Sequence, residues 1–102
     1  MKLNAGQKET IKRKAADCFR KETEVRKVVL FGSFENKTDP HDMDLAVFQD
    51  SGEDYLSLAM KYRRLVRPVA ARIPVDVIPV KADADDGAFL TEIGKGEVIY
   101  EK

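Results

Sequence analysis

Three aspartates lie in or beside the most apolar segments of the chain, and their spacing could gather carboxylates around a divalent cation. Asp42 and Asp44 are two positions apart, directly before the apolar run 45–48, and Asp76 lies inside the apolar run 74–78. Residues two apart in a strand share a face, so Asp42 and Asp44 should project together. Adjacent carboxylates repel unless a cation lies between them, and hard oxygen ligands favour Mg²⁺ or Mn²⁺.

Asp76 is the least expected of the three acids, because its apolar neighbours indicate a strand inside a sheet. An ionised carboxylate there needs a cation, a hydrogen-bond network or exposure on a face that lines a cleft. If its strand lies beside that of Asp42 and Asp44, all three acids converge. Two metal ions at such a site could hold the attacking and leaving oxygens of a phosphoryl displacement.

A Gly-Ser pair precedes the acids along the chain. Gly32 and Ser33 follow the apolar run 28–31, where a strand should end. Glycine lets the backbone approach a phosphate closely, and serine offers a hydroxyl and a backbone N–H. The pair is therefore a candidate phosphate site. Zinc is not expected, because the chain has one cysteine and one histidine.

The elements that must position these residues follow from periodicity and from turn residues. The element order is predicted as α-β-β-α-β-α-β. Pro68 should break or kink the second helix near Val66. The predicted helices are 5–21 with Asn4 as N-cap, 54–73, and 88–95 ended by Gly96, and the predicted strands are 25–31, 43–48, 75–80 and 98–100.

Length and composition predict a single globular domain over residues 1–102. Hydrophobic residues make up 43% of the chain and charged residues 35%. The 18 basic and 18 acidic residues cancel, so there is no bulk electrostatic reason for direct nucleic-acid binding. We expect a cytoplasmic protein, because the single cysteine fits a reducing compartment and no secretory signal or membrane-spanning apolar run is visible.

Three segments together resemble the DNA polymerase β-like nucleotidyltransferase superfamily. They are 29–34 (Val-Leu-Phe-Gly-Ser-Phe), 42–47 (Asp-Met-Asp-Leu-Ala-Val) and 75–78 (Val-Asp-Val-Ile). The chain looks most like the minimal nucleotidyltransferases, the small prokaryotic members, over about residues 25–100. The resemblance implies the α/β (α+β) nucleotidyltransferase fold, a mixed twisted sheet of about four strands with helices on one face.

The resemblance also implies roles for the site residues. Gly32 and Ser33 would bind the triphosphate of ATP, the expected substrate. Asp42 and Asp44 would ligate two Mg²⁺ ions, with Mn²⁺ as an alternative. Asp76 would ligate the catalytic metal and help to deprotonate an attacking hydroxyl. The implied reaction is nucleotidyl transfer from a nucleoside triphosphate, with pyrophosphate as the leaving group.

Many minimal nucleotidyltransferases pair with a small helical HEPN protein in a toxin–antitoxin pair. The resemblance implies that this chain is the antitoxin and transfers AMP to a tyrosine hydroxyl of its partner. The segment 34–37 departs from the family pattern, since Phe-Glu-Asn-Lys stands where a small residue and Arg-Gly are common. Lys37 could replace that arginine. The departure keeps open an alternative, a catalytically weak module that neutralises its partner by occlusion.

Two further activities fit the sequence less well. A small-molecule nucleotidyltransferase would need an acceptor pocket from a second subunit, and a template-directed polymerase would need template-holding domains and a basic excess. The remaining polar and aromatic candidates are interpreted as structural or solvated residues: His41, Cys18, Arg63, Arg64, Arg67, Tyr55, Tyr62 and Tyr100.

Overall fold

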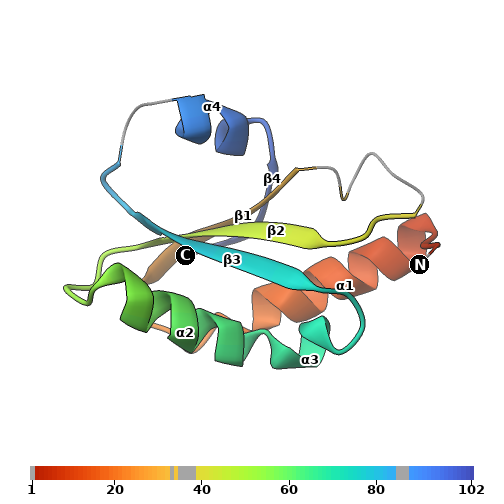
Figure 1. Ribbon diagram of the computed structural model, residues 1–102, viewed down its shortest axis with the longest axis horizontal. Helices are drawn as coiled ribbons and strands as arrows, with labels where there is room; N and C mark the ends of the chain where they lie inside the picture. Colours follow the sequence, from red (N-terminus) through yellow and green to blue (C-terminus); the bar gives the residue numbers. More distant parts are fainter. Residues whose placement is uncertain (1, 33, 35–38, 85–87) are drawn as a thin grey trace.

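The computed structural model describes residues 2–32, 34, 39–84 and 88–102 (Figure 1). Its strands form one sheet in the order β3-β2-β1-β4. Strand β1 is antiparallel to both of its neighbours, whereas β2 and β3 are parallel. The elements are α1 (Ala5–Asp17), β1 (Val25–Phe31), β2 (Met43–Gln49), α2 (Tyr55–Leu65), α3 (Arg67–Ala70), β3 (Val75–Lys81), α4 (Ala88–Gly94) and β4 (Glu97–Glu101). The predicted fold class and order of elements are confirmed, with α3 as an additional short helix.

The main core lies between the sheet and the helices α1, α2 and α3, which cover one face (Figure 1). Alternate residues of the central strands point into it, as the period of a strand requires. Val28 and Leu30 of β1 and Leu45 and Val47 of β2 are all buried there. The ring of Tyr62 meets that of Phe19 edge to face, with ring centroids 5.6 Å apart.

Helix α1 begins at a capping box, as the predicted N-cap indicated. The Asn4 side chain accepts a hydrogen bond from the backbone N–H of Gln7, and the Gln7 side chain accepts one from the Asn4 N–H. Within the helix, Lys12 is buried and its ammonium lies 2.9 Å from a carboxylate oxygen of Glu97. This ion pair ties α1 to β4 across the edge of the core.

The second helical segment is divided at Val66, as Pro68 predicted. Helix α2 is capped by Asp54, whose side chain accepts a hydrogen bond from the Ser57 N–H, and its C-cap is Val66. Helix α3 then starts with Pro68 in its first turn, where the missing N–H leaves no helical hydrogen bond unmade. The division lets the chain turn toward β3 after two buried anchors, Val66 and Val69.

Helix α4 packs on the opposite face of the sheet, above β1 and β2 (Figure 1). A smaller core forms there from Val29, Ala46 and Ile93. The expectation that the helices share one face was therefore wrong for α4. After α4 the backbone at Gly96 lies directly against β1. A Cβ on Gly96 would lie 2.3 Å from the Leu30 carbonyl oxygen. Within the described residues, no helix is long and apolar enough to cross a membrane.

Candidate metal and nucleotide site

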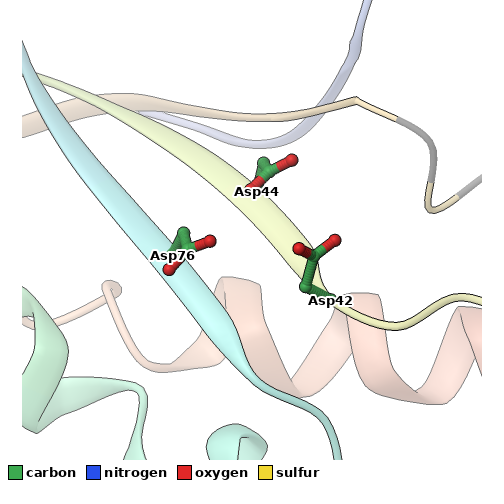
Figure 2. A group of neighbouring side chains, drawn as sticks. All are labelled: Asp42, Asp44 and Asp76. Atoms are coloured by element: carbon green, nitrogen blue, oxygen red, sulfur yellow. The ribbon is translucent and has the colours of Figure 1, made fainter.

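The three aspartates of the sequence prediction lie together on the α4 side of the sheet (Figure 2). Asp44 and Asp76 are direct partners in the parallel pairing of β2 with β3, and Asp42 stands just before β2. The Met43 N–H donates to the Pro74 carbonyl at 2.9 Å, which fixes this register at the start of both strands. Because the pairing is in register, all three carboxylates project from the same face.

The carboxylates are near enough to share a ligand. Each offers one oxygen atom, and these three atoms lie within 4.8 Å of one another. Asp42 and Asp44 are partly buried, whereas Asp76 is exposed on the edge strand β3. Asp76 was expected inside the sheet, and its position at an edge explains how an acid is tolerated within an apolar run.

The surroundings of Asp44 shift its pKa. Burial raises its pKa above the ordinary value, and the charges of Asp42 and Asp76 together with a hydrogen bond to Asp76 raise it further. In the described parts of the chain, no lysine or arginine forms an ion pair with these three carboxylates. The group thus carries negative charge that the described residues do not neutralise.

Gly32 stands over Asp44 at the end of β1. Its φ of +83° lies in the left-handed region, which glycine adopts without strain. A Cβ at this position would lie 2.5 Å from Oδ2 of Asp44, a distance that side chains cannot tolerate. Phe31, the preceding residue, pairs with Asp44 across the β1–β2 ladder. The glycine therefore allows the Asp44 carboxylate to lie directly against the backbone at the end of β1.

One residue close to Gly32, Phe34, belongs to the segment 34–41, which its polar and turn-forming residues predict to be a loop. Phe34 is buried in the main core, and Nζ of Lys8 lies 5.7 Å from its ring centroid. An aromatic residue within a polar segment was the available signal. The predicted phosphate ligand Ser33, and Lys37, lie outside the described residues.

The donor set fits divalent metal ions better than any other group. Three carboxylates on two paired strands offer only oxygen atoms, which suit hard cations. Burial, and then the neighbouring carboxylates, raise the pKa of Asp44, and a bound cation would offset both effects. Gly32 lets the backbone at the end of β1 lie directly against the Asp44 carboxylate. Chemically, such a site can hold phosphate oxygens through metal ions.

Comparisons with known proteins identify a family and a similar fold. A family model described as "Polymerase beta, Nucleotidyltransferase" matches residues 13–102. Among solved structures, the fold is similar to a chain in a crystal structure of the toxin–antitoxin MntA–HepT, with a TM-score of 0.64 and 15% sequence identity. The match covers 92% of this chain and 73% of that one. No curated protein matches the chain.

Proposed function

The chain belongs to the polymerase beta nucleotidyltransferase family, and from this premise we propose that it transfers AMP from ATP to a tyrosine hydroxyl of a partner protein. The observation that carries the proposal is the convergence of Asp42, Asp44 and Asp76 beside Gly32. The fold similarity to a chain of a toxin–antitoxin structure supports a role as the antitoxin of a HEPN-type pair. The expected cofactors are two Mg²⁺ ions, for which Mn²⁺ could substitute.

Each residue of the site has a role in this proposal. Asp42 and Asp44 would hold both metal ions, and Asp76 would hold the catalytic one. Bound divalent cations supply charge neutralisation on the phosphates and lower the pKa of the attacking hydroxyl. Gly32 and Ser33 bind the triphosphate, because the left-handed turn leaves the backbone accessible beside Asp44.

The reaction follows from this placement. The acceptor oxygen forms a bond to the α-phosphorus of ATP, and the bond from that phosphorus to the oxygen bridging toward the β-phosphate breaks. Pyrophosphate leaves with the electron pair. Asp76 accepts the hydroxyl proton, for which its exposure on the edge strand is suited because an acceptor can reach it from solvent.

The proposal is tested with a small helical HEPN-type protein, sought in the neighbouring reading frame by an Arg-x4-6-His motif, the motif expected of such a toxin. The two proteins are incubated with Mg²⁺ and ATP labelled in the α-phosphate. We expect label on the partner, and its loss in Asp42→Asn and Asp76→Asn. Asp83→Asn is the matched control, since Asp83 is exposed and follows the far end of β3. No transfer with any nucleoside triphosphate would overturn the proposal.

The second candidate is a catalytically weak module that neutralises its partner by occlusion. The sequence 34–37 favours it, because Glu35 is acidic where a basic residue would help to hold phosphate. The two candidate functions predict different results for one variant, Asp42→Asn. Transfer of AMP as the mechanism predicts that Asp42→Asn fails to neutralise the partner, whereas occlusion predicts that it neutralises as well as the wild type.

A further inference from the structure

Helix α2 carries large apolar side chains on its outer surface that nothing in the described structure covers. Leu56 is 68% exposed and Met60 is 55% exposed. The two residues are one turn apart on the helix and therefore adjacent. The opposite side of the helix, with Leu58 and Tyr62, is buried against the core. Two neighbouring apolar side chains in solvent, on a helix that already has a buried face, indicate an interaction surface.

Charges of opposite sign stand at the two ends of this surface. Glu53 is exposed just before the N-cap residue Asp54, and Arg64 and Arg67 are exposed at the C-terminal end. The side chain of neither arginine forms a hydrogen bond or an ion pair with any described residue. The segment that runs from Glu53 through α2 to Arg67, the first residue of α3, therefore presents an acidic end, an apolar middle and a basic end.

The pattern is symmetrical about Met60. Leu56 and Arg64 lie four positions on either side of it, and Glu53 and Arg67 lie seven positions on either side. A second α2 laid antiparallel, with the two Met60 side chains at the centre, would bring Leu56 against the aliphatic stem of Arg64 of the partner subunit. Glu53 would then face Arg67 of the partner subunit. A two-fold axis requires this kind of self-complementarity.

We propose that α2 is a self-association surface and that its occupant is a second copy of this chain in this antiparallel arrangement. A different acidic protein or a nucleic acid would use the arginines but would leave Glu53 facing like charge. The aspartates lie on the other face of the sheet from α2, so the dimer leaves both sites open. The inference does not depend on the proposed function.

The surface is short, which sets the strength of the association. Helix α2 has 11 residues, a length of about 16 Å at the usual rise. An interface built on it belongs to the small size class, in which complexes are weak or transient. We therefore expect a concentration-dependent equilibrium between monomer and dimer, with a dissociation constant on the order of micromolar or weaker.

Sedimentation velocity over a range of protein concentrations tests the proposal with the full chain. The wild type should shift toward twice the 11.5 kDa of one chain as its concentration rises. Met60→Glu, Glu53→Arg and Arg67→Glu should each remain monomeric under the same conditions. The double variant Glu53→Arg/Arg67→Glu should dimerise again, because both new ion pairs have the correct sign. Lys21→Glu, a charge reversal on an exposed residue away from α2, should behave as the wild type.

Two results would overturn the proposal. A wild type that stays monomeric at every concentration excludes the dimer. A dimer that survives Met60→Glu, or that the charge-reversed double variant does not restore, excludes this arrangement. Circular dichroism of each variant distinguishes a folded monomer from an unfolded chain. Binding of an acidic protein or of an oligonucleotide to a monomeric wild type would assign the surface to that occupant instead.

Discussion

Two clusters of acidic side chains within the described residues, one at Glu22 and Glu24 and the other at the three aspartates, have opposite surroundings. On the helical side, Glu24 accepts hydrogen bonds from Lys61 at 3.0 Å and from the Tyr62 hydroxyl at 2.9 Å. Burial works to raise the pKa of Glu24, but these hydrogen bonds outweigh it and the pKa is lowered. On the α4 side, Asp44 has two other carboxylates as neighbours, and its pKa is raised.

The difference separates an acid that stabilises the fold from acids that are available to a ligand. Around Glu24 the fold itself supplies a cation, Lys61, and a second hydrogen-bond donor, Tyr62, so the carboxylate is neutralised within the protein. Around Asp44 the paired strands bring carboxylates together without a described cation. A charge that the chain itself leaves uncompensated is a feature typical of functional sites. Each of the following changes tests whether the two clusters divide in this way.

The largest expected effect is on catalysis. Asp44→Asn should reduce the rate of nucleotidyl transfer by about a thousandfold or more, because it removes a ligand that both metal ions share. The same variant should be at least as stable as the wild type, since it removes a charge that its neighbours oppose. Initial rates with labelled ATP and thermal unfolding check the two parts. A variant that keeps its rate but unfolds more readily would assign Asp44 to stability.

The next effect is on stability. Glu24→Ala should lower the free energy of unfolding by about 1–3 kcal/mol, because the Tyr62 hydroxyl, on a fully buried side chain, loses its acceptor. The rate of transfer should not change, since Glu24 lies on the other side of the sheet from the aspartates. Urea unfolding with the exposed Glu101→Ala as control measures the loss. A fall in activity without a fall in stability would contradict the division.

The next prediction concerns the glycine that lies against Asp44. Gly32→Ala places a Cβ 2.5 Å from Oδ2 of Asp44 and puts alanine at φ +83°. We expect a loss of about 1–2 kcal/mol of stability from the left-handed backbone, together with reduced transfer. Gly52→Ala is the matched control, because nothing lies within 4 Å of a Cβ there. Equal behaviour of the two variants would show that Asp44 moves aside without consequence.

The smallest expected effect is on how stability depends on pH. The contributions of Asp44 and Glu24 to the free energy of unfolding should have opposite signs when they are measured with a chelator present. The folded-state pKa of Asp44 is above its ordinary 3.8, so Asp44→Asn should be the more stable protein at neutral pH. As the pH falls through the raised pKa toward 3.8, the folded wild type takes up a proton first, and its disadvantage should disappear.

Glu24 should behave in the reverse way. Its folded-state pKa is below the ordinary 4.5, so the stability that it contributes is present above pH 4.5 and is lost as the pH falls through the lowered value. Chemical unfolding of Glu24→Gln beside the wild type across this range measures the loss. Differences of the same sign for Asp44 and Glu24 would refute the contrast between the clusters.

Much of the fold and of the site could be predicted from the sequence. The period-two pattern of β2 predicted that Asp42 and Asp44 share a face, and the structure adds Asp76 through the parallel β2–β3 register. Turn and cap residues predicted the start of α1 at Asn4 and the division at Val66. These features depend on local chemistry, which single residues determine.

What the sequence could not predict depends on the tertiary arrangement. The apolar residues of α4 are too few to indicate which face they cover, and only the crossing from β3 to β4 decides it. The order of the strands places β3 at an edge, so Asp76 is exposed although its neighbours are apolar. Phe34 became a core residue because the turn at Gly32 directs the chain back toward α1.

The central claim is that the three aspartates form a metal-dependent nucleotide site, and calorimetric titration tests it without a partner protein. A non-hydrolysable ATP analogue is titrated into the wild type and Asp44→Asn, with Mg²⁺ and with a chelator. The account predicts binding to the wild type only when Mg²⁺ is present, and none to the variant. Binding without metal, or equal binding to both proteins, would contradict it.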